Sequence, residues 1–217
     1  MAGLAELVEA EVLRLAGLML AEHRLCDSCL GRQFAALGYG LSNRLRGEAL
    51  KVALLLEAFS KHVKGDRKAL EVVRHLAENG GLEAAKLTLE KHGMKVKGGG
   101  VCEICEDKLS MVEELGREAA ESLKGYEFKS FLVGARIPAR IVEAEDRLRS
   151  LYGIVWGENI KSEFTREVGK VISRLTGRQV DFKNPDVLVT ISPYSSRRRV
   201  TVRASPLFVE GRYRKLV

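Results

Sequence analysis

Hydrophobic positions in the first 123 residues recur at helical spacing. Two stripes with intervals of mostly three and four predict long helices with one apolar face. These stripes are Leu4, Leu7, Val8, Val12, Leu15 and Met19, and Leu45, Ala49, Val52, Leu56, Phe59 and Val63. Shorter helices are predicted over residues 66–79 with Asp66 as N-cap, over 82–92 before a stop at Gly93, and over 109–123. Because all four prolines follow residue 137, this part of the chain is predicted to be a helical array.

The pattern changes near Gly125. Residues 126–137 are rich in aromatic and branched side chains, which favours a strand, and a helix is predicted over 139–151. A further helical stripe covers 160–175 and ends before Gly177. Alternating apolar residues at 187–191 and 200–202 predict a β-hairpin or two neighbouring strands. The expected class is α+β, a helical region followed by a small α/β domain.

The cysteines form two pairs with two residues between the members of each pair. They are Cys26 and Cys29, and Cys102 and Cys105, separated by 72 residues. Two such turns supply the four thiolates of a tetrahedral, structural zinc site, which would staple the first helix to the middle of the chain. An iron–sulfur cluster uses the same four ligands, and two local disulfides or inert thiols are the remaining alternatives.

Charge is distributed unevenly along the chain. The net charge is +7, yet residues 1–157 hold 23 basic and 23 acidic side chains, while residues 158–217 hold 13 and 6. Clustered cations are what phosphate binding requires, with a solvated face as the alternative, and Tyr194 and Tyr213 are candidates for stacking on bases. The predicted RNA-binding residues are Lys170, Arg174, Arg178, Lys183, Arg197, Arg198, Arg199, Arg203, Arg212 and Arg214.

Several classes of protein are disfavoured by the sequence. No P-loop, dinucleotide fingerprint or nucleophile elbow occurs, and the histidines are scattered without a ligand pattern, so no catalytic residue is predicted. No segment has the length of uncharged apolar sequence that a membrane span needs, and charged residues interrupt the apolar start. We therefore expect a cytoplasmic protein without a membrane partner.

Five segments carry a family resemblance. They are CDSCLGRQF at 26–34, GLSNRLRG at 40–47, CEIC at 102–105, GENIKSEFTREVGK at 157–170 and RASPLFVEGRYRKLV at 203–217. Together they resemble the N-terminal half of the archaeal tRNA pseudouridine synthases that act on the TΨC loop. The resemblance implies a four-cysteine zinc site, a THUMP-type RNA-binding domain and tRNA as partner. It implies a zinc-stapled helical region at 1–118, a THUMP-like domain at 119–210 and the start of a linker at 211–217.

The chain departs from this family in one respect. Family members continue into a catalytic domain bearing an aspartate that attacks uridine, and no aspartate here lies in a segment resembling that motif. The resemblance therefore implies the substrate-recognition part of the enzyme, which recruits tRNA for a separate pseudouridine synthase catalytic domain or subunit. The alternatives are a self-sufficient RNA-modifying enzyme and a zinc-containing protein-interaction adaptor.

Overall fold

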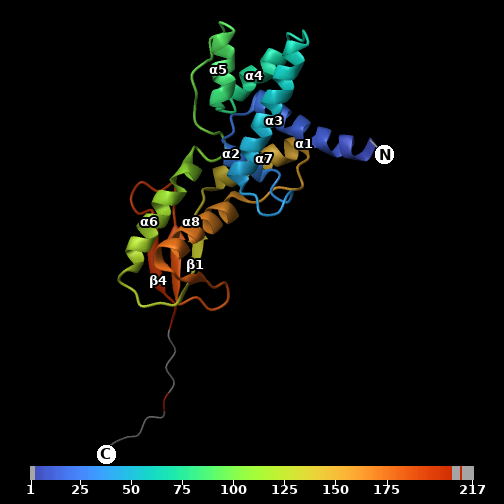
Figure 1. Cartoon of the computed structure of the whole chain (residues 1–217). Coiled ribbons are helices and arrows are strands. Elements are labelled where there is room, and N and C mark those ends of the chain that lie inside the picture. The colour runs from blue at the N-terminus through green and yellow to red at the C-terminus, as the bar shows by residue number, and fades with distance from the viewer. Residues whose placement is uncertain (1–2, 207–210, 212–217) are drawn as a thin grey trace, which may run out of the picture. The chain divides into compact units, whose positions relative to one another are not determined.

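The chain folds into two compact units. This computed structural model describes the backbone of residues 3–206 and 211, and the side chains from residue 11 onward (Figure 1). One unit, here called the helical unit, comprises residues up to 110 together with 137–163. The other, called the sheet unit, comprises 111–136 and the described residues from 164 onward. The predicted boundaries at residues 118 and 210 stay a prediction.

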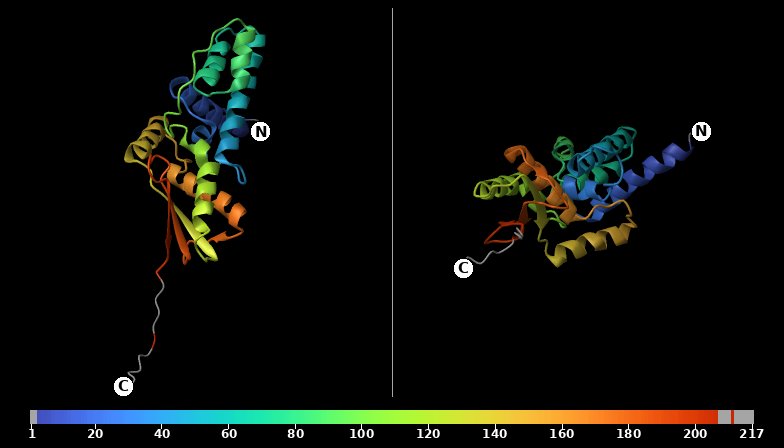
Figure 2. Two further views of the ribbon diagram at one scale, coloured as in Figure 1. Left: turned by 90° about the vertical axis from the view of Figure 1, so that its left-hand side faces the viewer. Right: turned by 90° about the horizontal axis from the view of Figure 1, so that it is seen from below.

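The helical unit contains most of the helices. Its elements are α1 (Gly3–Glu22), α2 (Asp27–Arg32), α3 (Asn43–Val63), α4 (Ala69–Glu78), α5 (Glu83–Lys91), the 3₁₀ turn η1 (Lys108–Met111), which ends at the boundary, and α7 (Ala139–Tyr152). Helix α4 packs between α3 and α5, and α2 packs closely along α3 (Figure 2). Fully buried leucines from α1, α2, α4 and α5 form its core, among them Leu20, Leu30, Leu76 and Leu89.

The sheet unit is a mixed sheet covered on one face by two helices. Its elements are α6 (Val112–Leu123), β1 (Ser130–Ala135), most of α8 (Ile160–Thr176), β2 (Gln179–Val180), β3 (Val187–Ile191) and β4 (Val200–Ala204). The strand order is β2-β1-β3-β4, with β1 parallel to both β2 and β3, and β4 antiparallel to β3. Figures 1 and 2 show α6 and α8 on the same side of the sheet.

Alternation along the strands explains this one-sided packing. Phe131, Val133 and Ala135 of β1 are buried, as are Val187, Val189 and Ile191 of β3, with which they are in register. The two helices approach each other closely at Gly116, where an added Cβ would lie 2.3 Å from a methyl group of Val171. Only glycine fits there without displacing its neighbour.

The predicted α+β class is confirmed, and most predicted elements are present with small shifts. The hairpin at β3 and β4 forms, and Gly93 and Gly177 end their helices at positive φ. Helix α4 begins at Ala69, three residues later than predicted, because Asp66 accepts a hydrogen bond from the Lys68 amide in a preceding turn. The sequence patterns did not indicate α2 or β2, which are six and two residues long.

The predicted core face of α3 is wrong. Leu45, Val52, Leu56, Phe59 and Val63 are 39–72% exposed. The buried face lies on another side of the helix and includes polar residues, namely Asn43, Arg46, Gly47, Lys51, Leu54, Leu55 and Ala58. Periodicity identified the helix correctly but not its buried side, because two charged residues and a glycine occupy that side for the specific contacts described below.

Candidate metal centre and nucleic-acid interface

The two cysteine pairs come together in the helical unit. The sulfur atoms of Cys26, Cys29, Cys102 and Cys105 all lie within 4.8 Å of one another. The Sγ atoms of Cys26 and Cys105 are 3.6 Å apart, and all four cysteines are free thiols. A tetrahedral ion with Zn–S bonds of about 2.3 Å separates its sulfurs by roughly 3.8 Å, so the four side chains lie at metal-binding distance.

Local backbone structure aims the four sulfurs at one point. Cys26 is the N-cap of α2, and its Sγ accepts a hydrogen bond from the Cys29 amide at 3.4 Å. After the second pair, Glu106 and Asp107 adopt φ values of 48° and 58°. Such left-handed conformations are costly for residues other than glycine and are kept where a turn requires them. The Asp107 carboxylate accepts from the Cys102 amide at 3.0 Å, which holds this turn closed.

The four thiols cannot all ionise without a cation. Contact with Cys102 raises the pKa of both Cys26 and Cys105, and burial raises the pKa of Cys29. Hydrogen bonds from the neighbouring thiols, Cys105 foremost, lower the pKa of Cys102. Since zinc binds thiolates, binding a divalent cation would release protons from the thiols whose pKa is raised.

Arg32 lies beside the cysteines and is fully buried. It donates from Nη2 to Cys29 Sγ at 3.4 Å, from Nε to Glu145 at 2.6 Å and from Nη1 to Glu163 at 2.6 Å. Burial disfavours its charge, but the Cys29 sulfur and the two carboxylates outweigh burial and raise the pKa of Arg32 well above its ordinary value. For Glu163, burial prevails over the nearby guanidinium and raises the pKa.

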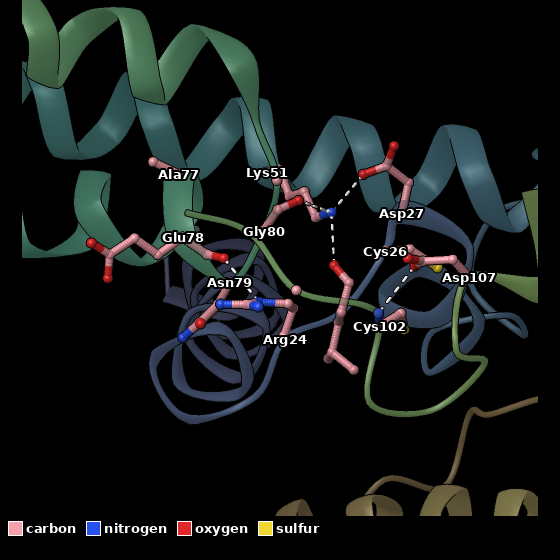
Figure 3. A pocket seen from close by; sticks show the side chains of 14 residues that line it. Arg24, Cys26, Asp27, Lys51, Ala77, Glu78, Asn79, Gly80, Cys102 and Asp107 are labelled. Carbon is pink, nitrogen blue, oxygen red and sulfur yellow. Dashed lines mark hydrogen bonds and ion pairs between the residues drawn. The ribbon is translucent and has the colours of Figure 1, made fainter. Parts of the chain in front are cut away.

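A second buried cation fastens the first cysteine turn to α3. The ammonium of Lys51 donates to the carbonyls of Leu25 and Gly80 at 3.0 and 2.5 Å, and to Asp27 Oδ1 at 2.6 Å (Figure 3). Its three donors are thus used, at the wall of a cavity of about 240 Å³ that Cys26 and Cys102 also line. The cavity therefore presents no free cation at Lys51.

The predicted RNA-binding residues fall into groups in the structure. Lys170 pairs with Glu167 of its own helix, Arg174 with Glu113, and Arg199 with Glu114 and Glu118 of α6. Arg178, Lys183, Arg197, Arg198 and Arg203 form no ion pair within the described part of the chain. Arg212 and Arg214, with the stacking candidate Tyr213, lie outside the described residues.

Topology separates the unpaired cations further. Arg178 precedes β2 and Lys183 precedes β3, at the end of the sheet where the parallel strands begin. Arg197 and Arg198 lie in the β3–β4 connection, at the opposite end of β3, which is about 16 Å long at 3.3 Å per residue. Arg203 lies on β4 opposite Leu188, near the start of β3. The predicted cluster is therefore divided between the two ends of the sheet.

A hollow of about 590 Å³ occupies the first of these ends. Lys129, Arg178 and Lys183 line it, and Phe182 at its wall is 81% exposed. Asp181 also lines it, but two backbone amides, of Lys183 and Asn184, donate to its carboxylate at 2.7 and 3.0 Å. Hydrogen bonds from these amides, that of Asn184 foremost, lower the pKa of Asp181. The hollow thus combines three cations, one carboxylate whose charge the backbone amides stabilise, and an exposed aromatic ring.

Two of its residues, Lys129 and Phe182, were missed in the sequence. Lys129 is remote in sequence, so only the parallel pairing of β1 with β2 brings it beside Arg178. Phe182 directly precedes Lys183, and that adjacency is the signal that could have found it. Tyr194, which was expected to stack on bases, is half-buried, and its ring meets the edge of Phe164 at a centroid distance of 6.5 Å.

Among the helices that the structure describes, none is both long and apolar enough to span a bilayer.

Comparison with known proteins agrees with this architecture. Residues 115–192 match the family model described as the Pus10 THUMP domain, archaeal. Most of α6 and all of β1, α7, α8, β2 and β3 fall within this segment, whereas β4 begins eight residues after it ends. No solved structure matches the chain.

Curated relatives extend the similarity over nearly the whole chain. The tRNA pseudouridine synthase Pus10 of Thermofilum pendens is 40% identical over 91% of this chain and 44% of its own length. That of Acidilobus saccharovorans is 38% identical over 91% and 48%, and that of Aeropyrum pernix 34% identical over 96% and 48%. The chain thus spans about half the length of the relatives it matches. It contains a THUMP domain of the archaeal Pus10 type, and the resemblance to the archaeal tRNA pseudouridine synthase family is confirmed over that half.

Proposed function

We propose that this chain is a tRNA-binding, zinc-stabilised module that recruits tRNA for pseudouridine synthesis in the TΨC loop. The observation that carries the proposal is the hollow lined by Lys129, Arg178 and Lys183 within the segment that matches the THUMP model. Its cations have no carboxylate ion-pair partner among the described residues, and phosphates are the anions that such clusters bind. The names of the relatives, tRNA pseudouridine synthases, supply the class of nucleic acid.

The side chains of the hollow are suited to different parts of a nucleotide. The two lysines act as point charges on phosphates, and Arg178 adds a planar fork suited to two phosphate oxygens. Phe182 offers a flat exposed surface on which an unpaired base stacks. The proposed ligand is therefore a single-stranded part of tRNA, whose unstacked bases are accessible in the way that duplex bases are not.

The binding proposal is tested by salt dependence. The Arg178→Ala, Lys183→Ala double variant is expected to bind tRNA more weakly and to lower the slope of log affinity against log salt by roughly 1.5 to 2, because two phosphate contacts are lost. Phe182→Ala should weaken binding by about 1–3 kcal/mol and leave that slope unchanged. Unchanged affinity and slope in the double variant would remove the hollow from the interface.

Arg174→Ala is the matched control. Arg174 lies on α8 one turn before Arg178 and is exposed, but Glu113 occupies its guanidinium at 2.6 and 2.8 Å. Its loss should leave tRNA affinity within about twofold of wild type, since a neutralised side chain releases few counterions. A large effect of this control would mean that charge alone, at any position, determines binding.

We further propose that Cys26, Cys29, Cys102 and Cys105 hold a structural zinc ion. A single ion suits sulfurs that all lie within 4.8 Å of one another, whereas a four-iron cluster places each thiolate on a different iron atom and spreads the sulfurs further. When bound, zinc would supply a cross-link between α2 and the turn at 102–107 and no reaction chemistry, because four thiolates leave no open position.

Elemental analysis and chelation test the metal proposal. Protein purified without added metal should contain about one zinc per chain and no visible absorption, and a strong chelator should lower both helical circular dichroism and tRNA affinity. Iron with sulfide, or a metal-free protein with full helicity, would contradict it. The double variant Cys102→Ser, Cys105→Ser should reproduce the effect of the chelator.

A further inference from the structure

We propose that Arg32 is a positioning residue that couples the metal centre to the start of α8. It does so by donating one hydrogen bond to a metal-binding thiolate while two buried carboxylates hold its other nitrogens. This inference rests on the proposed four-cysteine metal centre and extends it to residues outside the ligand set.

The guanidinium fork is used on three sides. Nη2 donates to Cys29 Sγ at 3.4 Å, Nε to Glu145 Oε1 at 2.6 Å and Nη1 to Glu163 Oε2 at 2.6 Å. Only arginine carries a planar set of donors that reaches three separated acceptors, so lysine could not replace it. The contact between the nitrogen and the sulfur is therefore fixed by the two carboxylates and is not an incidental approach.

The contact between Arg32 and Glu145 continues to the backbone of α8. Glu145 accepts at Oε2 from the Ile160 amide at 2.9 Å, and Ile160 is the first residue of that helix. Glu163 lies one turn further along α8. A contiguous path therefore runs from the Cys29 sulfur through Arg32 and Glu145 to the first amide of α8, and all of it is buried in the helical unit.

Charge gives this path its energetic content. Four thiolates around a divalent ion carry a net charge of −2, and a hydrogen bond from a cation stabilises the Cys29 thiolate at the cost of no additional ligand. A bound metal that fixes Cys29 also fixes Arg32 and, through Glu145, the first turn of α8. Because coupling between sites is reciprocal, an ordered first turn of α8 in turn strengthens metal binding.

Cobalt substitution of the full chain tests the inference. We expect Arg32→Met to weaken Co²⁺ binding about 10- to 100-fold and to move the sulfur-to-cobalt charge-transfer band to lower energy, because a thiolate loses a hydrogen-bond donor. Arg149→Met is the matched control. Arg149 pairs with the same Glu145 at 3.2 Å but makes no contact with a cysteine among the described residues. The charge-transfer band of the Arg149→Met variant should stay at the wild-type position even if the variant is less stable to unfolding.

Hydrogen exchange on the wild-type protein provides a test that needs no variant. Chelation should accelerate exchange at residues 160–163 at least about tenfold more than in α5, which belongs to the same unit but lies outside this path. A charge-transfer band that Arg32→Met leaves in place, or equal acceleration at the two segments, would overturn the role of Arg32 alone. A wild-type protein that shows no such band with Co²⁺ would overturn the metal centre and this inference together.

Discussion

The packing of α2 on α3 makes a sharp prediction for the substitution Gly47→Ala. A Cβ at this position would lie 1.9 Å from the carbonyl oxygen of Asp27 and 2.9 Å from the amide nitrogen of Gly31, both of which are backbone atoms. Ordinary contact begins near 3.4 Å, so the two helices would have to separate by about 1.5 Å. Since Asp27 follows Cys26, this separation also displaces the first cysteine turn.

The magnitude follows from two opposing effects. Overpacking of a well-packed site costs about 3 kcal/mol at the upper end of its usual range, and alanine regains about 1 kcal/mol of helix propensity over glycine. The net destabilisation of about 2 kcal/mol corresponds to a Tm lower by roughly 4–8 °C for a chain of this size. Scanning calorimetry of the zinc-loaded protein measures this shift, and a zinc competition assay should show weaker metal binding.

Gly17→Ala is the control for the same chemical change. Gly17 lies in α1, and an added Cβ there would be 3.5 Å from a methyl group of Leu54, which is ordinary contact. This variant should gain up to about 1 kcal/mol and melt roughly 2–4 °C higher. If Gly47→Ala melts at or above the wild-type temperature, the close approach of the two helices is not as described.

Three further predictions concern single side chains. Lys51→Met should lower the free energy of unfolding, measured with urea, by about 3–5 kcal/mol, because three oxygens lose a buried cation. Lys61→Met on the same helix removes an exposed ion pair and should lower it by at most about 0.5 kcal/mol, and similar losses in the two variants would contradict the buried role of Lys51. Gly116→Ala should lower the Tm by several degrees, because the added Cβ clashes with Val171 of α8. Gly169→Ala should raise the Tm, because its added Cβ would lie 3.6 Å from the nearest atom, and equal shifts in the two variants would count against the packing of α6 on α8. Two backbone amides donate to Asp186 and lower its pKa, so the ionised carboxylate stabilises the fold fully above the ordinary pKa of 3.8 and less as pH falls toward the lowered pKa. The Tm difference between wild type and Asp186→Asn should therefore shrink as pH falls below 3.8, and a constant difference would refute the assignment.

The sequence predicted most elements because their signals are local. Stop signals at Gly93 and Gly177 and alternation in β3 depend on neighbouring residues, and the structure places these features where the pattern indicated. The approach of the four sulfurs was predictable too, because two paired cysteines imply a common ligand whatever the intervening chain does.

What the sequence could not show depends on contacts between distant segments. The buried side of α3 is occupied by Lys51, which donates to the carbonyls of Leu25 and Gly80, 26 and 29 residues away, so hydropathy favoured the wrong face. Likewise, Arg174 and Arg199 belong to a basic cluster in the sequence but are neutralised by carboxylates of α6. Pairing of this kind becomes visible only when the helix and the sheet are placed together.

The proposed function requires that this chain bind tRNA as a specific ligand. The most direct measurement is the affinity of the zinc-loaded wild-type chain for an unmodified tRNA transcript, compared at the same salt concentration with a single-stranded DNA of equal length. We predict that tRNA binds at least about tenfold more tightly, because shape and stacking add to the electrostatic attraction that both polyanions share. Equal affinities would mean that the chain recognises only the charge of a polyanion and would contradict specific tRNA binding.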